Sequence, residues 1–529
     1  MLKKPSEILN EYKSGYDFKA SLGSKGLFEQ NKINERFFIG DQWHGAKCGN
    51  DRPLVRHNVI KRIGNYKISQ ILSAPISVSY SAEGVPSVPN GLKQFKTDGK
   101  ISYDEINYIL DAFSNYRKVT AERVKFSDLT ERVLRNSFIS GSSVLYTYWN
   151  PNVVTGLYAD SENKVGINGD ICCEILDIED IVFGDPYCEN IQNQPYIIIS
   201  SRKPTDEVIG EARLNGADIG TLKMISENSQ NGKTTLYTKL YKEYKRGEGY
   251  TIKCIKVTEK CVVRDEFDTR LRLYPLAIFH WERKSNSAYG ESEITYLIPN
   301  QIAINRMITA NVWSTMTTGM PIMVVNGDTV TQKITNDPGQ IVKIYGSNED
   351  VAGAVRYISP PSFTKDFDES IASLIENTLN QSGANEVALG DSRADNATAL
   401  FAMRDATLMP LQIIKNRFYS FVEDVARIWA DFWVIYYGRR NIKLKDAEGS
   451  RYIEFNGDRY KNLILNATVD INPASSYTER ERADMLILLF EKGAISKEQL
   501  LSRLPEGLVP DVSTLIKEKD LEELSDERI

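Results

Sequence analysis

Residues 299–318 read PNQIAINRMITANVWSTMTT, and this stretch decides the fold. Its large apolar residues recur at four-residue spacing on one helical face: Ile304, Ile308, Val312 and Met316. This spacing is typical of an amphipathic α-helix. Gly319 and Pro321 follow directly, and both residue types commonly end helices. The sequence therefore predicts a long helix over 299–318.

A small β-rich segment is expected to follow this helix. Residues 322–325, 340–345 and 354–358 have the apolar and β-branched character of strands. Two turn sequences separate them: Asn326-Gly327-Asp328 and Asp337-Pro338-Gly339. We expect three short strands that form an insert between two helices.

The second of these helices is predicted to begin near Asp366. Its apolar stripe consists of Phe367, Ile371, Leu374, Ile375 and Leu379. The opposite face carries a polar stripe of Glu369, Ser373, Glu376 and Asn380. One face of the helix should therefore pack against protein, and the other, which carries two carboxylates, should face water.

A third helix is predicted after a loop at 390–396, with Asn396 as its N-cap. Pro410 predicts a kink or a break, because proline cannot donate the helical hydrogen bond. Beyond it, apolar residues from Leu411 to Phe432 alternate steps of three and four until Gly438. This pattern predicts a long amphipathic helix.

The remaining sequence mixes helical and strand-like patterns. Helices are expected at 28–38, 58–72 and 106–138. Strand-like runs, for which antiparallel pairing is expected, lie at 144–148, 196–200, 236–244, 251–257 and 277–281. Two further strands are expected at 451–455 and 463–471. Capping-box pairs, Thr478 with Glu481 and Ser496 with Gln499, indicate a helical C-terminal domain. The predicted fold class is α+β.

Composition limits the possible functions. A chain of 529 residues is long enough for several domains. The formal charge of -6 disfavours a protein that grips nucleic acid through phosphate neutralisation. No signal-peptide core and no apolar run of membrane-spanning length is visible, so we expect a cytoplasmic protein. The six cysteines include no CxxC pair, which disfavours a zinc site.

None of the patterns that could carry chemistry is convincing. Asn231-Gly232-Lys233-Thr234-Thr235 is similar to the end of a phosphate-binding loop, but Glu227 stands where the motif needs glycine. This segment is interpreted as a surface turn. The three histidines, His44, His57 and His280, have no second ligand at metal spacing. We predict no catalytic, cofactor-binding or metal-binding residues.

One acidic group keeps an enzymatic alternative open. Clustered carboxylates can hold two metal ions for phosphodiester hydrolysis. The candidates here are Asp177, Glu179, Asp180 and Asp185. Their alternation with apolar residues is more typical of a half-exposed strand or turn. A metal-dependent phage nuclease is therefore the alternative hypothesis, and a structural role for these residues is favoured.

The order of the predicted elements resembles the portal protein family of tailed bacteriophages. The resembling text is 34–43 (NERFFIGDQW), Arg52-Pro53, Asn58, 289–292 (YGES), 297–301 (LIPNQ), 388–390 (ALG) and 393–396 (RADN). The resemblance implies a portal-type subunit with an α/β wing, a two-helix stem, a small β-rich clip, a long kinked tunnel helix and a helical crown. Their expected ranges are wing 1–290 with 438–472, stem 291–320 and 362–383, clip 321–361, tunnel loop and helix 385–437, and crown 473–529.

The resemblance also implies the function and the sites. A portal protein forms a ring, usually of twelve subunits, at one capsid vertex of the virion. The ring passes double-stranded DNA during packaging and ejection, docks the terminase large subunit and then a head-tail adaptor, and contacts major capsid and scaffolding proteins. A second alternative is another ring-forming head-tail adaptor. No cofactor, enzymatic activity or membrane contact is implied.

Three groups of residues are the candidate sites of this interpretation. The channel lining is expected at Glu369, Ser373, Glu376 and Asn380. The tunnel loop is expected at Gly390, Asp391, Ser392, Arg393 and Asp395. Docking by the clip is expected at Asn326, Asp328, Lys333 and Asp337.

Overall fold

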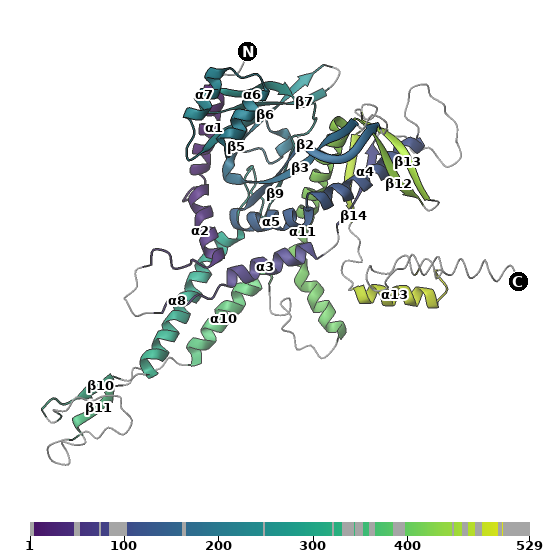
Figure 1. Ribbon diagram of the computed structural model, residues 1–529. Helices are drawn as coiled ribbons and strands as arrows, with labels where there is room; N and C mark the ends of the chain where they lie inside the picture. Colours follow the sequence, from purple (N-terminus) through teal and green to yellow (C-terminus); the bar gives the residue numbers. More distant parts are fainter. Residues whose placement is uncertain are drawn as a thin grey trace.

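A computed structural model shows a body of helices and sheets from which a pair of helices projects (Figure 1). It describes residues 5–46, 53–73, 76–83, 103–160, 165–246, 249–319, 322–328, 330, 343, 353–358, 365–384, 397–446, 449–457, 464–470, 479–495 and 500. Within these residues every strand pairing is antiparallel. The mixture of helices and antiparallel sheets confirms the α+β class.

Helices form the first part of the body. They are α1 (Pro5–Ala20), α2 (Leu27–Ile39), α3 (Val59–Leu72), α4 (Tyr103–Arg123) and α5 (Phe126–Ser140). The helices expected at 28–38 and 58–72 are confirmed, and the Asn58 side chain caps α3 by accepting from Lys61 N at 3.0 Å. The single helical run expected at 106–138 is wrong, because Lys125 has a φ of 52° and turns the chain between α4 and α5.

Two sheets form the middle of the body. A three-stranded sheet has the order β3 (Val165–Asp177), β2 (Ser142–Asp160), β9 (Leu276–His280). A five-stranded sheet has the order β4 (Ile181–Phe183), β5 (Tyr196–Pro204), β6 (Lys233–Lys245), β7 (Gly249–Val257), β8 (Val262–Asp268). The helices α6 (Thr205–Leu214) and α7 (Ile219–Glu227) lie between β5 and β6 in the chain. The five strand predictions in this region are confirmed.

Three further strand pairs lie outside these sheets. They are β1 (Ser77–Glu83) with β14 (Ile464–Asp470), β12 (Arg439–Asp446) with β13 (Gly449–Asn456), and β10 (Ile322–Val325) with β11 (Val355–Ile358). The first pair joins segments almost four hundred residues apart in the chain. The strand expected at 340–345 lies almost wholly outside the described residues, whereas those at 322–325 and 354–358 are confirmed as β10 and β11.

Two of the three long helices differ from the bounds that the sequence pattern predicts. Helix α8 spans Glu293–Gly319 and therefore starts before Pro299, because Ser292 caps it by accepting from Ile294 N at 3.1 Å. Helix α10 spans Lys365–Ser382 as expected. Helix α11 spans Ala397–Tyr436 and runs through Pro410 without a break.

Helix α11 supplies much of the core. Its aromatic side chains are buried against the other elements of the body, and Trp429 and Trp433 are almost fully buried. Trp433 stacks on Phe113 of α4, with ring centroids 5.6 Å apart. The amphipathic pattern from Leu411 to Phe432 therefore marks a core helix of the body.

The C-terminal region is described only in part. Helix α13 spans Glu479–Glu491, which fits the first capping box at Thr478. The second capping box and residues 501–529 lie outside the described residues. The helical character of the C-terminal domain is therefore confirmed for α13 alone.

Candidate functional site

The projecting helix pair is the most distinctive feature of the molecule. Helices α8 and α10 lie side by side and lead away from the body, and the β10–β11 hairpin is at their far end (Figure 1). They run antiparallel, because Asn300 near one end of α8 donates to Thr378 Oγ1 at 3.3 Å and Asn311 donates to Asp368 Oδ1 at 2.6 Å. Two polar contacts thus hold the register of the pair.

The packed face of α10 is the face that the sequence predicted. Ile371 and Leu379 are buried, and the other three apolar residues of the stripe are partly buried. Burial of such side chains contributes roughly 1.5–3 kcal/mol each when complete. Hydrophobic contact with α8 and the body therefore fixes the rotation of α10 about its own axis.

The opposite face of α10 is exposed and acidic. Glu369, Ser373, Glu376 and Asn380 are all exposed. From Asp366 to Ser382 the helix contains four carboxylates and no lysine or arginine. A water-facing surface of this composition repels phosphate groups and does not attract a polyanion.

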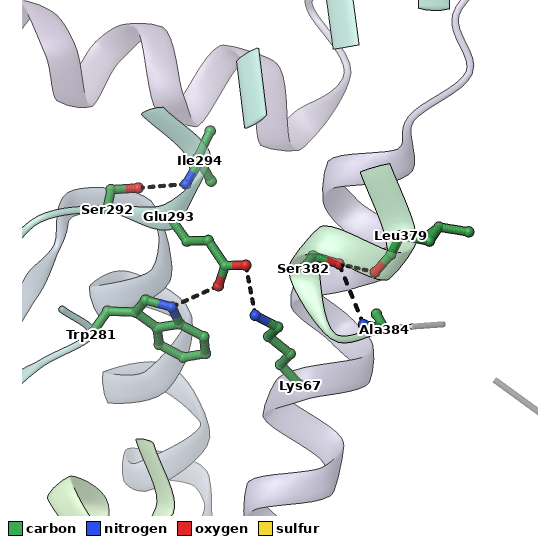
Figure 2. Close-up of polar contacts among 8 residues, drawn as sticks. All are labelled: Lys67, Trp281, Ser292, Glu293, Ile294, Leu379, Ser382 and Ala384. Atoms are coloured by element: carbon green, nitrogen blue, oxygen red, sulfur yellow. Dashed lines mark hydrogen bonds and ion pairs between the residues drawn. The ribbon is translucent and has the colours of Figure 1, made fainter. Parts of the chain in front are cut away.

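The N-terminal end of α8, here called its root, is held by a buried ion pair (Figure 2). The Glu293 carboxylate accepts from Lys67 Nζ of α3 at 2.6 Å and from Trp281 Nε1 at 2.9 Å. The side chains of Lys67 and Glu293 are only 8% and 11% exposed. A buried ion pair depends on both partners, since removal of one leaves an uncompensated charge in the protein interior.

Trp281 connects this root to the core helix α11. Its indole donates to Glu293, and its backbone carbonyl accepts from Arg417 Nη1 of α11 at 2.7 Å. The first turn of α8, the end of strand β9 and the middle of α11 therefore meet at one fully buried residue.

A row of buried polar side chains on α8 continues this anchor, and sequence reasoning missed it. Gln301 Oε1 accepts from Val59 N at 3.0 Å and Ile60 N at 3.3 Å. Asn305 Oδ1 accepts from His57 N at 3.0 Å, and Thr309 Oγ1 from Val55 N at 3.2 Å. Unpaired buried amides are costly, so these bonds dock residues 55–60 onto α8.

The signal for this row was present in the sequence. Gln301, Asn305 and Thr309 follow one another at four-residue spacing and therefore share one helical face. Polar residues at this spacing are usually assigned to the solvent side of a helix. Here the chain segment that covers the face supplies backbone donors, so the polar face is buried.

The other predicted site residues fall partly outside the described residues. At the hairpin tip, Asn326 and Asp328 are exposed, and Asn326 Oδ1 accepts from Asp328 N at 3.1 Å, which makes the expected turn. Lys333, Asp337 and the tunnel-loop residues 390–395 lie outside the described residues.

The acidic group of the nuclease hypothesis lies on the body, away from the helix pair. Asp177 ends β3, and Glu179 and Asp180 lie on the short helix η1 (Ile178–Asp180). Glu179 accepts from Asn31 Nδ2 at 3.0 Å, and Asp185 accepts from Tyr187 N at 3.0 Å. Among the described residues, no three His, Cys, Asp or Glu side chains are grouped to hold a metal ion.

The structure also describes the segment that is similar to a phosphate-binding loop and the histidine His280. Asn231 and Gly232 both have positive φ angles and form a turn closed between Gln230 and Lys233, as expected for a surface turn. His280 is buried, and Ser142 Oγ lies 2.8 Å from its Nδ1. Ser142 Oγ also accepts from Gly290 N at 2.8 Å.

His280 gives the fold a specific pH dependence. Burial, and then the charges of Arg283 and Arg417, lower the pKa of His280 to about 4 from 6.5. The unfolded chain therefore takes up the proton first, so this contribution is complete above pH 6.5 and is lost as the pH falls toward 4. The loss should reach about 3 kcal/mol.

Urea denaturation at pH 7 and pH 4.5 measures this loss. His280→Asn, which keeps an acceptor for Ser142, should remove most of the difference between the two pH values that the wild-type chain shows. Burial raises the pKa of acids such as Asp424, which changes stability with pH in the opposite direction, so the comparison must be made between the two chains. An unchanged pH difference in the variant would contradict the assignment.

Comparison with known proteins adds no family to this description. No protein-family model and no curated protein matches the sequence. Among the described residues, no helix combines the length and the apolarity needed to cross a membrane. The projecting pair and its acidic face are therefore the observations on which a functional assignment must rest.

Proposed function

We propose that this chain is the subunit of a phage portal, a ring that passes DNA through one capsid vertex and has a structural, non-enzymatic role. The observation that carries the proposal is the antiparallel α8–α10 pair, which projects from the body, ends in a β-hairpin and exposes the acidic face of α10. In this assignment α8 and α10 are the stem, and the segment with β10 and β11 is the clip.

Electrostatics supports a channel for this face. In a closed ring each exposed carboxylate of α10 is repeated in every subunit, so Glu369 and Glu376 would form two acidic rings. Such a wall repels phosphates and releases no bound counterions when DNA passes. DNA would slide along it with little adhesion, which suits a passage that a motor uses in one direction and ejection in the other.

Exposed apolar side chains support assembly. Met316 on α8 is 51% exposed, and Met409 and Ile413 on α11 are 76% and 61% exposed. Large exposed apolar residues on helices commonly mark protein contacts. The contacts proposed here are between neighbouring subunits of the ring.

Negative-stain microscopy of the purified chain tests this proposal. We expect closed rings with a central opening, and twelve subunits is the number that the family resemblance implies. Native mass measurement should agree with a single closed stoichiometry. A chain that remains monomeric at micromolar concentration and shows no rings would contradict the proposal.

The hairpin tip is the proposed docking surface for the terminase and later for the head-tail adaptor. Asn326 and Asp328 are exposed and follow β10 directly, and β10 and β11 lie at the far end of the projection (Figure 1), where they are accessible to a large partner. Asp328→Lys should weaken terminase binding and leave ring formation unchanged. Binding at wild-type strength would place the docking surface elsewhere.

A further inference from the structure

Arg117 of α4 is the exception among the buried cations of this protein. Lys19, Lys67 and Lys239 are each at most 6% exposed, and each has partners. Lys19 Nζ donates to the carbonyl oxygens of Ile178 and Ile181, Lys67 pairs with Glu293, and Lys239 pairs with Glu11. Arg117 is only 8% exposed, and it has no hydrogen-bond or ion-pair partner among the described residues.

This arrangement is unfavourable in a separate subunit. Arginine keeps its charge in proteins, and a largely buried guanidinium without a partner is stabilised by an anion that binds beside it. Burial lowers the pKa of Arg117, and the one electrostatic neighbour that opposes this effect is the phenol of Tyr80. A neighbouring residue on the same helix shows the usual solution, since Arg123 pairs with Asp170 and donates to Ile171 O at 3.0 Å.

Arg117 lines a cavity of about 710 Å³ that is open to solvent. The cavity lies where the end of α3 and the connection between α4 and α5 meet. Its apolar lining includes Leu72, Ile76 and Phe126. A cationic group beside an apolar lining suits an occupant that carries one carboxylate next to apolar side chains.

The acidic residues at the rim of the cavity exclude some classes of anion as the occupant. Glu122, Asp128 and Glu131 also line it, and all three are exposed. They repel a polyanion such as DNA or a phosphate dianion, and they attract a basic group that accompanies the carboxylate. The matching ligand is therefore a protein segment with an acidic, an apolar and a basic side chain close together.

Helix α13 of this chain has that chemistry, and its apolar residues are uncovered. Met485, Ile487, Leu488 and Phe490 are 58%, 43%, 49% and 39% exposed. Glu491 and Lys492 follow them directly and are exposed as well. The fold of a single subunit leaves these apolar side chains in water, so α13 of another copy is available as the occupant.

We infer that the Arg117 cavity binds the end of helix α13 from a second copy of this chain, with the Glu491 carboxylate on the Arg117 guanidinium. The apolar residues of α13 then cover the lining of the cavity, and Lys492 faces the acidic rim. This inference rests on the proposed function to the extent that assembly brings a second copy within reach.

Charge exchange in the full-length chain tests the contact. Arg117→Glu alone and Glu491→Arg alone should each weaken self-association at least about tenfold in sedimentation experiments. The double variant Arg117→Glu/Glu491→Arg should restore it to within about threefold, because the pair is re-formed with reversed polarity. Lys118→Glu, a change of the same charge at the exposed neighbouring position on α4, should leave it unchanged.

A second variant separates recognition from folding. Arg117→Met removes the buried charge, so the Tm of the dissociated chain should rise by about 2 °C or more while self-association weakens about tenfold. A lower Tm with unchanged self-association would overturn the inference, as would a double variant no better than the single ones. Closed rings that are insensitive to Arg117→Met would overturn the inference and leave the proposed function intact. If the chain forms no closed rings but the double variant restores self-association in open assemblies, the proposed function is overturned and the inference stands.

Discussion

Replacement of both Glu369 and Glu376 by lysine in every subunit is expected to convert a channel that repels DNA into one that binds it. Both residues are exposed on the same face of α10, two helical turns apart. Neither side chain is packed in the subunit, in contrast to the buried Ile371 and Leu379. Folding and ring formation should therefore be nearly unchanged.

The expected size of this effect follows from counterion release. A ring with lysines on this face would neutralise several phosphates at once, and six to ten such contacts make affinity fall about 10³- to 10⁵-fold between 50 and 200 mM salt. Binding of short duplex DNA, measured by fluorescence anisotropy over this salt range, should show that steep dependence. Packaging in a reconstituted motor assay should slow in parallel.

A matched charge change provides the control. Glu227 at the end of α7 and Glu259 after β7 are exposed on the body, so Glu227→Lys/Glu259→Lys alters the net charge equally without changing α10. This control should bind DNA weakly and package normally. If the α10 variant assembles and packages at the wild-type rate, the exposed face of α10 does not line the channel.

Loss of one partner of the Lys67–Glu293 pair is expected to be the most destabilising change at the root of the helix pair. Lys67→Met leaves the Glu293 carboxylate buried with the Trp281 indole as its remaining partner. Breaking a buried pair in this way costs about 3–5 kcal/mol. The free energy of unfolding from urea denaturation, followed by tryptophan fluorescence, should fall by that amount.

Removal of both charges is the control for this prediction. In Lys67→Met/Glu293→Gln the glutamine can still accept from Trp281 Nε1, and no unpaired charge remains. Most of the lost free energy should therefore return, and the double-mutant cycle should give a coupling of at least about 1.5 kcal/mol. Additive losses would mean that the two side chains do not act as a pair. Lys61→Met, an exposed position on α3, should change stability by less than about 0.5 kcal/mol.

Periodicity predicted the parts of the fold in which local pattern and burial agree. The apolar stripe and polar stripe of α10 are found as expected, because a helix with one apolar and one charged face has a single favourable orientation at a protein surface. The strands predicted between 144 and 281 are also found, because their apolar and β-branched runs favour strands. Strand β3 was missed, because the run 165–177 mixes glycine, cysteine and acidic residues without alternation.

Proline predicted the ends of helices poorly where tertiary contacts compensate for a local cost. Pro299 lies inside α8 and Pro410 inside α11, although each removes a helical hydrogen bond. The cap at Ser292 and the packing of α8 and α11 in the body outweigh that loss. The division between α4 and α5 depends on one residue with positive φ, Lys125, which no residue preference indicates.

The sequence by itself determined the α+β class, the helix–insert–helix order and the separation of α10 into an apolar and an acidic face, because each of these follows from the spacing of side chains along a local element. Only the tertiary structure decided that the polar side of α8 is buried and that Trp281 joins α8, β9 and α11. It also decided that Arg117 is buried with no hydrogen-bond or ion-pair partner in the described part of the chain. The physical reason is that the sequence does not show whether a polar side chain forms its hydrogen bonds with water or with a distant segment. That choice is made when the chain packs.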